Sequence, residues 1–533
     1  MLLSSLALVS VGGLLSPPTP VVSPFPQDTA PRLVVLLVVD QLRPDHLLRY
    51  RAEWTGGFKR LLDEGIFFPD GRQDHAITQT GPGHSTVLSG RFPAHTGIVT
   101  NDLGVPDSLA PLVDDPKAVG ASPRRFQGSA LLDWMIAGDS TTRMLSVAMK
   151  NRSAILPIGR ARGEVYWWSN LGFFTTSRYY RDSLPTWVQG WNQRDPMRGL
   201  TGRSWELLKA EAAYPEADEL PAEAGRDGRN TFPHALPADP GQAAALLPHF
   251  PWMDSLTLDI ALTGISALGI GSGEGPRTDL LSISLSSVDE IGHDFGPDSR
   301  ELHDMLLRLD GYLGWFLDSL AATTPRGETL LVLTSDHGTQ AMPEQAAPIG
   351  GRQAGRAWPS AMVRGVASEL RDRWRTDFKI RFDYGIVTAD LAALRSRGID
   401  TDSLSQSLAA RFRQEPYVDR VYTPLSLARA PGSDPIASRW RHTIPDEFGW
   451  LVAVTPLEGT TWDSWPTGAN HGTPWLADVQ VPVLFWGGGI EPRTVHRAVR
   501  TVDIGPTLAR RIGVTPTEPQ DGVVLPEVAG RAR

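Results

Sequence analysis

The 533-residue chain contains no cysteine, and this absence excludes several kinds of site at once. Without cysteine there is no disulfide framework, no thiolate zinc site and no cysteine nucleophile. Basic residues are in the minority: 51 Lys and Arg stand against 60 Asp and Glu, for a formal net charge of −9. This balance argues against a broad nucleic-acid or anionic-membrane surface, because such surfaces need clustered Lys and Arg. Any anion must therefore be captured locally.

The N-terminus has an apolar run that is too short to cross a membrane. Residues 2–15 are rich in Ala, Ser, Val and Gly, and a Pro-rich stretch follows over 17–26. A membrane-spanning helix needs ~20 apolar residues. The run is typical of a signal-peptide core, although no Lys or Arg precedes it. We expect residues 1–27 to be a signal peptide and linker, and the protein to be periplasmic or secreted with no stable membrane partner. An uncleaved N-terminal anchor is the alternative.

Four apolar runs predict buried strands of one sheet. Residues 33–39, 280–285, 329–333 and 481–486 are continuous and apolar, which is typical of strands buried on both faces of a parallel sheet. Amphipathic helical patterns lie between the runs. The pattern over 300–320 has an apolar face made by Leu306, Leu307, Leu309, Leu313, Trp315 and Phe316. Alternating strands and helices predict an α/β fold, with a doubly wound, largely parallel sheet flanked by helices.

The pattern changes over residues 344–447. Arg-rich amphipathic stretches and short strands, such as 379–382, appear there. We expect this segment to be an inserted cap subdomain, and residues 28–343 and 448–533 to form the core. Ligands of open α/β sheets bind beyond the carboxyl ends of the strands, so we expect the functional site at that edge.

Three of the expected strands lead into carboxylates. Asp40 follows the run at 33–39, Asp289 follows the run at 280–285, and Asp336 follows the run at 329–333. Each aspartate alone has an ordinary structural explanation, as a turn residue or a surface partner. Together they would meet at the carboxyl edge of the sheet.

Three histidines extend this pattern. His293 lies four residues after Asp289 and would share a helical face with it, and His337 follows Asp336 directly. His471 lies in a loop before the last apolar run. Catalytic zinc binds imidazole nitrogen and carboxylate oxygen through three protein ligands and keeps an open position. Three aspartates and three histidines therefore suit two zinc ions with three ligands apiece.

The segment Gln-Thr-Gly-Pro-Gly-His-Ser-Thr over residues 79–86 predicts the start of a helix. Free N–H groups at such a start stabilise an anion. Thr80 stands where a nucleophile belongs, and the alternative is that Thr80 is only the helix N-cap. Ester hydrolysis through a threonine needs a deprotonated hydroxyl and a stabilised leaving oxygen, and a two-metal site supplies both.

The order and flanks of these residues resemble those of the alkaline phosphatase superfamily. The shared motifs are Val-Val-Asp40-Gln-Leu-Arg, Thr80-Gly-Pro-Gly-His, Asp289-x-x-x-His293, Asp336-His337-Gly and His471-Gly. The resemblance extends from about residue 33 to residue 522. The segment Met-Lys-Asn-Arg-Ser-Ala-Ile-Leu over 149–156 is similar to that of the monomeric, threonine-nucleophile, phosphate-irrepressible alkaline phosphatases of bacterial periplasms.

This resemblance implies a function. Thr80 would form a phosphothreonine on small-molecule phosphate monoesters, while Lys150, Arg152 and Asn101 would hold the non-bridging phosphate oxygens. The protein would act as a monomer and would have no nucleic acid as a stable partner. Two zinc ions would be held by two ligand sets, with Thr80 joining the second: Asp289, His293 and His471, and Asp40, Asp336 and His337.

Other functions compete with this one. A phosphodiesterase or nucleotide pyrophosphatase on the same two-zinc core would need apolar room where Lys150 and Arg152 stand, so these cations favour the monoesterase. A sulfatase would need a formylglycine made from Cys or Ser, whereas the nucleophile position is Thr80. A non-catalytic protein is disfavoured because every expected ligand is in place. The diester alternative stays open through aromatic residues that can line a second organic group: Tyr166, Trp167, Trp168, Phe173, Phe174, Tyr179 and Tyr180.

Overall fold

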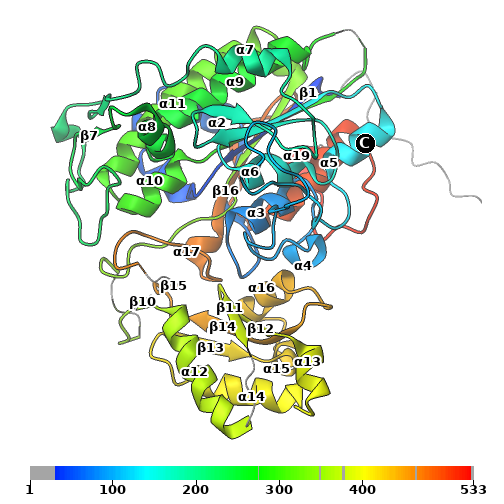
Figure 1. Ribbon diagram of the computed structural model, residues 1–533. Coiled ribbons are helices and arrows are strands. Elements are labelled where there is room, and N and C mark those ends of the chain that lie inside the picture. Colours follow the sequence, from blue (N-terminus) through cyan, green and yellow to red (C-terminus); the bar gives the residue numbers. More distant parts are fainter. Residues whose placement is uncertain are drawn as a thin grey trace, which may run out of the picture.

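The computed structural model describes residues 30–529 apart from 274, 347, 349, 375–378, 463 and 464. The expected signal peptide and linker, residues 1–27, lie outside the described residues. Of the helices that are described, none combines the length and the apolar character that crossing a bilayer demands. A large core lies above a smaller sheet with its own helices in Figure 1.

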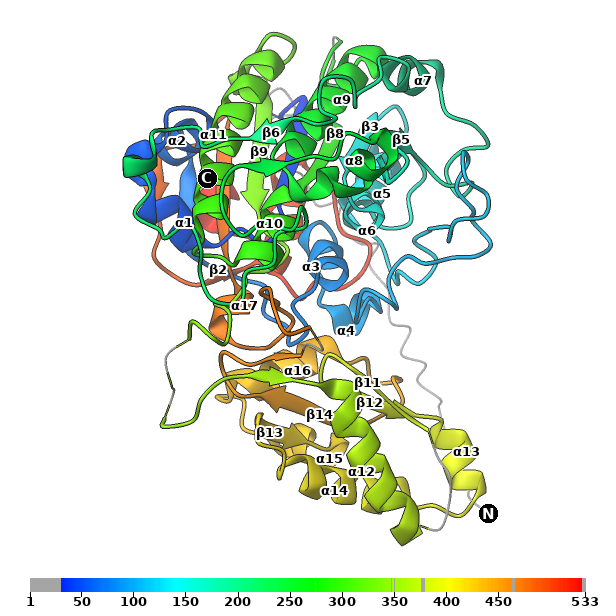
Figure 2. The same ribbon diagram turned by 60° about the vertical axis from the view of Figure 1, so that its left-hand side comes forward.

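A ten-stranded sheet forms the centre of the core (Figures 1 and 2). Its order is β17-β2-β16-β9-β1-β8-β3-β4-β5, and β18 also pairs with β2. The pairs β9-β1, β1-β8, β8-β3 and β3-β4 are parallel, which confirms the expected α/β fold with a largely parallel sheet. The strands are β1 (Leu33–Val39), β2 (Ile66–Arg72), β3 (Met144–Ala148), β4 (Glu164–Ser169), β5 (Phe173–Thr175), β8 (Asp279–Leu285), β9 (Thr329–Thr334), β16 (Gln480–Gly487), β17 (Arg493–Thr494) and β18 (Val499–Arg500).

The direction of β16 corrects the expectation that the run at 481–486 continues the parallel set. β16 pairs antiparallel with both β9 and β2. A strand buried on both faces has the same apolar pattern in either direction, so the pattern does not encode polarity. The chain returns to the core from the smaller sheet through α17 (Leu476–Val479), so β16 begins at the end of the core that faces the smaller sheet (Figure 1).

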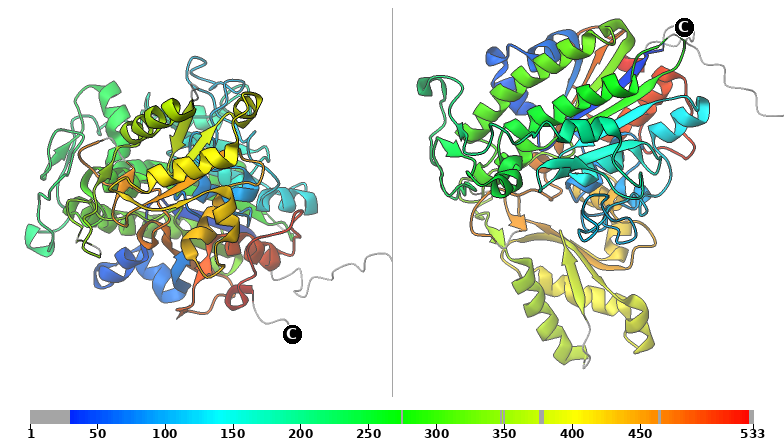
Figure 3. Two further views of the ribbon diagram at one scale, coloured as in Figure 1. Left: turned by 90° about the horizontal axis from the view of Figure 1, so that it is seen from below. Right: turned by 45° about the horizontal axis from the view of Figure 1, so that its top comes forward.

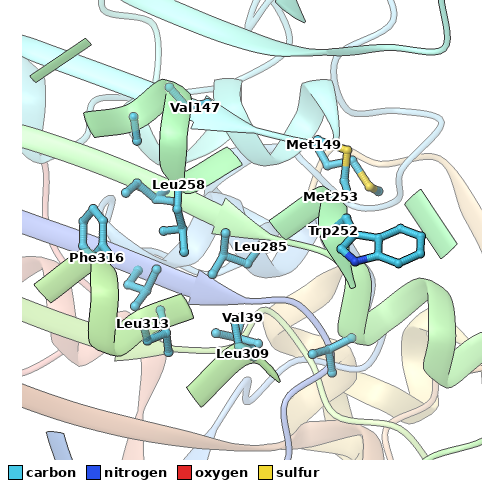
Figure 4. Packing of buried hydrophobic residues seen from close by; sticks show 14 of the residues in the cluster. Val39, Val147, Met149, Trp252, Met253, Leu258, Leu285, Leu309, Leu313 and Phe316 are labelled. Carbon is cyan, nitrogen blue, oxygen red and sulfur yellow. The ribbon is translucent and has the colours of Figure 1, made fainter. Parts of the chain in front are cut away.

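β1 shows why the apolar runs are continuous. Its odd-numbered residues, from Leu33 to Val39, join one hydrophobic cluster, and its even-numbered residues, from Val34 to Val38, join another on the opposite face. Alternate residues of a strand point to opposite faces, so a strand covered on both sides needs an apolar residue at every position. Figure 4 shows Val39 of β1 with Leu285 of β8 in the first cluster.

Helices cover both faces of this sheet. The first face carries α1 (Pro44–Arg49), α2 (Gly57–Glu64), α9 (Trp252–Leu268), α10 (Ser287–Phe295) and α11 (Arg300–Ala321). The second carries α3 (Thr80–Val87), α5 (Leu131–Gly138), α6 (Asn151–Ile155), α18 (Ile504–Ile512) and α19 (Pro526–Ala529). Trp315 was expected on the apolar face of α11 but is 43% exposed. Position 315 lies ~200° around the helix from Leu313, which explains the difference.

The smaller sheet and its helices, here called the cap, lie below the strand ends of the core (Figure 3). Its antiparallel order is β11-β12-β14-β13, and helices cover both faces. The elements are α12 (Pro359–Trp374), β11 (Ile380–Asp383), β12 (Ile386–Ala389), α13 (Leu391–Ser396), α14 (Thr401–Phe412), β13 (Val418–Tyr422), α15 (Pro424–Arg429), α16 (Pro435–Thr443) and β14 (Trp450–Pro456). β14 begins after residue 447, where we expected the cap to end, so the cap extends to Pro456; its other expected limits stay predictions.

The cap is seated on loops of the core. Ile77 and Val99 of the core join the hydrophobic cluster around Trp440 of α16. Arg439 of α16 donates to the backbone oxygen of Pro474 at 2.7 Å and contacts Asp74 at 3.3 Å. These contacts hold the chain segments that lead to Thr80 and Asn101. The remaining elements are α4 (Pro93–Thr96), α7 (Thr186–Asn192), β6 (Ser204–Trp205), β7 (His234–Ala235), α8 (Pro240–Leu246), β10 (Arg356–Ala357), β15 (Thr461–Trp462) and α17 (Leu476–Val479).

Candidate active site

Four strands that are neighbours in the sheet end at the edge where the expected site residues lie. Asp40 directly follows β1, and its N–H donates to the backbone oxygen of Leu285 at 2.9 Å. Asp336 lies two residues after β9, Asp289 lies in the first turn of α10 after β8, and Lys150 follows β3. Because β9, β1, β8 and β3 are neighbours in the sheet, their carboxyl ends gather these side chains in one crevice.

Asp289, His293 and His471 form the first group of potential metal ligands, here called the Asp289 cluster. One ligand atom from each lies within 4.8 Å of the others. Nε2 of His293 is 3.3 Å from Oδ1 of Asp289, and Nε2 of His471 is 3.6 Å from the same oxygen. Two imidazole nitrogens thus face one carboxylate oxygen, an arrangement that suits a cation.

Asp40, Asp336 and His337 form the second group, here called the Asp40 cluster, and all three side chains are fully buried. Nε2 of His337 lies 3.3 Å from Oδ1 of Asp40 and 3.7 Å from Oδ2 of Asp336. These three atoms have no hydrogen-bond partner among the described residues. Buried polar atoms are normally hydrogen-bonded, so three such atoms gathered at one place fit a bound cation. The two clusters coincide with the ligand sets that the resemblance implied.

Each histidine of the two clusters uses its Nδ1 for a hydrogen bond to the backbone. The acceptors of His293, His471 and His337 are the carbonyl oxygens of Ala469 at 2.8 Å, Thr78 at 2.6 Å and Gly338 at 3.1 Å. A carbonyl oxygen only accepts, so Nδ1 carries a proton and Nε2 is the atom left to face the carboxylates. Such backbone bonds orient ligating imidazoles in metal sites.

The two clusters are adjacent. The rings of His337 and His471, one from each cluster, stack with centroids 3.6 Å apart at an interplanar angle of 19°. The Nζ of Lys150 lies between the clusters, 2.8 Å from Oδ2 of Asp40 and hydrogen-bonded to Oδ2 of Asp289. Two-metal hydrolases hold their ions ~3.5–4 Å apart, and this proximity of the ligand groups fits such a pair.

The crevice is rich in carboxylates, and their charges shift the pKa values of the ligand side chains. Burial, reinforced by Asp289 and Asp336, raises the pKa of Asp40 well above its usual range. Burial opposes ionisation of Asp289 as well, but Lys150, His293 and His471 together outweigh it and hold the pKa of that carboxyl well below its usual range. Burial alone would lower the pKa of His293, whereas the Asp289 carboxylate raises it to about 9. The crevice is therefore built to attract cations.

Thr80 is the first residue of α3, and Gln79 precedes it as the N-cap. The alternative that Thr80 is only the helix N-cap is therefore wrong. Thr80 is 1% exposed, and its Oγ1 accepts from Nη2 of Arg152 at 3.4 Å. Asn101 lies next to them, since its Oδ1 accepts from the N–H of Gly81 at 2.7 Å. The structure thus brings Arg152 and Asn101, two of the three residues that the resemblance assigned to phosphate binding, close to Thr80.

The start of α3 packs against the Asp40 cluster. A Cβ added to Gly83 would lie 2.1 Å from the carbonyl oxygen of Asp336, so only glycine permits this approach. His84 is fully buried one turn after Thr80, with its Nδ1 2.9 Å from the Thr80 carbonyl oxygen and 3.1 Å from Oδ2 of Asp336. The sequence predicts no role for His84, because a single histidine in a helix gives no signal for such a contact.

Gln41 links the two clusters and was not singled out from the sequence. Its Nε2 donates to Oδ1 of Asp289 at 2.8 Å, and its backbone N–H lies 3.3 Å from Oδ1 of Asp336. Its φ of 66° is in the left-handed region, which is uncommon for a residue other than glycine. Gly292 makes room for the side chain, since a Cβ there would lie 1.9 Å from Oε1 of Gln41.

Replacement of Gln41 by alanine is expected to weaken binding of divalent cations about 10–100-fold, the usual effect of removing a group that orients a metal ligand. Alanine has the same Cβ as glutamine at this φ, so the substitution isolates the amide. Competition with a chromogenic chelator measures the dissociation constant. The control is Gln189→Ala on α7, where the amide donates to the backbone oxygen of Leu184. Equal affinities of Gln41→Ala and the parent would show that Gln41 does not orient the ligands.

The aromatic residues that kept the diester alternative open are mostly core residues. Tyr166 and Trp168 belong to the hydrophobic cluster on one face of the sheet, and Trp167 belongs to the cluster on the other. Phe174 is fully buried as well. Alternation along β4 explains this division, and it removes most of these rings as a wall for a second ester group.

A third group of potential ligands, Asp45, His46 and Asp298, lies at α1. Arg43 donates to both oxygens of Asp45, at 2.8 and 2.7 Å, and Arg49 contacts Asp298 at 2.6 Å. The arginines neutralise the carboxylates, so we assign this group to a salt-bridge network rather than to a metal site.

The fold and the two clusters fit the class of metal-dependent α/β hydrolases. A family model described as type I phosphodiesterase / nucleotide pyrophosphatase matches residues 34–428. The alkaline phosphatase PhoV of Synechococcus elongatus is 30% identical over 95% of this chain and 94% of its own length. The alkaline phosphatase PafA of Elizabethkingia meningoseptica is 29% identical over 94% of this chain and 95% of its own. The crystal structure of wild-type alkaline phosphatase PafA matches with a TM-score of 0.87 and 27% identity, covering 94% of this chain and 99% of that chain.

The chain belongs to the type I phosphodiesterase / nucleotide pyrophosphatase family, within the alkaline phosphatase superfamily.

Proposed function

We propose that the chain is an alkaline phosphatase that hydrolyses small phosphate monoesters through Thr80 at a two-zinc site. The position of Thr80 carries the proposal: its hydroxyl contacts Arg152, and its helix packs against the Asp40 cluster. A hydroxyl nucleophile, a guanidinium and two ligand clusters in one crevice are the parts that phosphoryl transfer requires. The near full-length matches to alkaline phosphatases support the same activity.

Zinc is the proposed cofactor, with two ions per chain. Each cluster offers three ligands of mixed nitrogen and oxygen type, and catalytic zinc sites use such sets with one position left open. Thr80 would join the Asp40 cluster as a further ligand. When bound, the ions would lower the pKa of the attacking hydroxyl and stabilise negative charge on the departing oxygen.

The proposed reaction has two steps, and Thr80 takes part in both. The Thr80 hydroxyl releases its proton to solvent, its oxygen attacks phosphorus, a Thr80–phosphate bond forms, and the bond to the alcohol breaks. The departing alcohol takes a proton from solvent. Water then attacks the phosphothreonine, which regenerates the Thr80 hydroxyl and releases inorganic phosphate. The overall reaction consumes one water molecule for each ester cleaved.

Three side chains would hold the non-bridging oxygens of the phosphate. Arg152 offers a planar fork of donors suited to two oxygens. Lys150 remains an ammonium, because the carboxylates of Asp289 and Asp40 raise its pKa despite its burial. Oδ1 of Asn101 is occupied by the N–H of Gly81, which orients its amide NH₂ as the remaining donor. Charge on these oxygens grows in the transition state, where cations and donors placed in advance lower the barrier.

The same cations favour a monoester over a diester. A monoester dianion carries more negative charge and three non-bridging oxygens, whereas a diester replaces one oxygen with an organic group. Lys150 and Arg152 occupy the crevice where that group would need apolar room. A phosphodiesterase on the same core is the second candidate, because the matching family includes type I phosphodiesterases.

A matched pair of esters separates the two candidates. We expect zinc-loaded protein to prefer p-nitrophenyl phosphate to its methyl diester. Lys150→Ala should lower kcat/KM for the monoester about 100-fold, the usual cost of losing one preorganised charge in an active site, and should change the diester far less. Lys209→Ala, which removes an ammonium paired with Glu53, is the control. A parent that prefers the diester and is indifferent to Lys150 would assign the chain to the phosphodiesterases.

We also propose that the protein is exported to the periplasm or secreted and acts as a monomer. The signal-like run at residues 2–15 supports export, and a chain without cysteine is compatible with an oxidising compartment. Cell fractionation tests export, and light scattering tests the monomeric state.

A further inference from the structure

Two cavities lie where residues of the cap and of the core meet, and the smaller of them adjoins the Asp289 cluster. The larger, of about 480 Å³, is lined by the aromatic residues Phe382, Tyr384, Trp462 and Trp465 and by Asn470. The smaller, of about 280 Å³, is lined by His293, Trp465 and Asn470 among others. Trp465 and Asn470 line both, so the two cavities lie on either side of them. Together they have the size of a site for a small organic group.

The smaller cavity opens on the metal-ligand cluster through His293. The His293 side chain is 26% exposed, whereas the side chains of Asp289 and His471 are 3% and 6% exposed. Asn470 precedes His471 in the chain, and its Oδ1 accepts from the backbone N–H of His471 at 2.9 Å. A group that leaves the crevice on this side therefore passes His293 and meets Asn470 and Trp465.

The proposed reaction sends the alcohol of the ester in this direction. Thr80 stands next to the Asp40 cluster, and displacement at phosphorus puts the departing oxygen in line on the far side from the nucleophile. The Asp289 cluster lies on that far side of Lys150. The organic group on the departing oxygen then points out past His293. This step rests on the proposed function.

The wall of the larger cavity, beyond Trp465 and Asn470 from His293, is aromatic and firmly held. The rings of Phe382 and Trp462 meet edge to face with centroids 4.9 Å apart. Tyr384 forms the tip of the β11–β12 hairpin with a φ of 44°, a conformation that needs support from surrounding structure. A Cβ added to Gly472 would lie 2.4 Å from Cδ1 of Tyr384, so the hairpin tip is pressed against the loop of His471.

Trp465 is the exposed member of this wall. It is 72% exposed, although tryptophan side chains are usually largely buried. A large exposed ring at the mouth of two cavities can pack against a planar organic group. The charged pair bordering the smaller cavity, Arg226 and Asp294, neutralises itself at 2.8 Å. The walls thus offer apolar rings and an amide but little net charge.

We propose that these two cavities are the leaving-group subsite and that Trp465 makes the enzyme selective for phosphate monoesters of aromatic alcohols. The cap contributes Phe382 and Tyr384 to the wall of this subsite, whereas Trp462 and Trp465 follow the cap in the chain. Trp465 is a specificity residue, because it contacts the alcohol and not the phosphate.

Trp465→Ala in the zinc-loaded, full-length protein tests this assignment. We expect kcat/KM for 2-naphthyl phosphate to fall about tenfold, which corresponds to ~1.4 kcal/mol, and kcat/KM for methyl phosphate to stay unchanged. Calorimetry with benzylphosphonate and methylphosphonate, which are not hydrolysed, should show the same selective loss in affinity. Trp465→Phe should recover most of it. Trp315→Ala, at an exposed tryptophan on α11, is the matched control.

The outcomes are distinct. Parallel losses for both phosphates, or an unchanged ratio between them, would overturn the role of Trp465 while leaving the phosphatase assignment intact. A parent protein that hydrolyses neither monoester would overturn the proposed function and this inference with it. A loss confined to the aromatic ligands, and repaired by phenylalanine, would support the subsite.

Discussion

Thr80→Ala is expected to lower kcat/KM for phosphate monoesters about 10³-fold or more, because it removes the only oxygen at this position that can bond to phosphorus. The fold should survive the change. Gln79 and not Thr80 caps α3, and the Thr80 hydroxyl accepts one long hydrogen bond, at 3.4 Å, from Arg152. Loss of such a contact changes stability by no more than ~1 kcal/mol. Turnover at low substrate concentration tests the loss of kcat/KM, and the midpoint of thermal unfolding tests whether the fold survives.

A second readout distinguishes a nucleophile from a positioning residue. Acid-quenched parent protein, mixed with substrate, should gain one phosphoryl group on the peptide that contains residue 80, as seen by mass spectrometry. Thr80→Ala should gain none. Thr80→Ser keeps the hydroxyl and should retain turnover to within about tenfold. If Thr80→Ala carries full metal and still turns over like the parent, water must attack the substrate directly.

Removal of divalent cations is expected to abolish turnover, again by about 10³-fold or more, because both stabilisation of the departing oxygen and activation of Thr80 depend on them. Dialysis against a strong chelator followed by metal analysis should give inactive protein, and zinc should restore activity as the content approaches two ions per chain. Magnesium should restore less, because three of the six ligand atoms are imidazole nitrogens, which magnesium disfavours.

Asp336→Asn supplies the matched variant for this experiment. It keeps the shape of the side chain but removes a charge from the Asp40 cluster, so bound zinc should fall from two ions to one. The Asp289 cluster should keep its ion. Zinc removal should also lower the thermal midpoint, since the buried carboxylates of Asp40 and Asp336 then lose their counter-charge. Full turnover in metal-free protein would rule out the two-metal mechanism.

Much of the site could be predicted because its signals are local in the chain. A continuous apolar run such as residues 33–39 must be covered on both faces, and an aspartate directly after it must lie at the sheet edge. The spacing of Asp289 and His293 matches one turn of helix, and both lie in α10. These predictions depend only on the repeat of a strand or a helix, which residues close in sequence determine.

Other features have no local signal. The antiparallel direction of β16 follows from where the chain re-enters the core, and the exposure of Trp315 follows from what α11 packs against. Gln41 contacts Asp289 and Asp336 only because β8 and β9 flank β1 in the sheet. Its left-handed backbone is invisible in a sequence that shows no glycine there.

The sequence by itself determined the α/β class, the edge of the sheet where the candidate site lies, and the aspartates and histidines that form its two candidate ligand clusters. The tertiary structure alone decided that His337 and His471 stack, that Thr80 meets Arg152, and that Phe382 and Tyr384 of the cap share a cavity with Trp465, which also borders the cavity at His293. The physical reason is distance along the chain. Local patterns follow from backbone geometry, whereas contacts between remote segments depend on strand order and on the packing that closes the core against the cap.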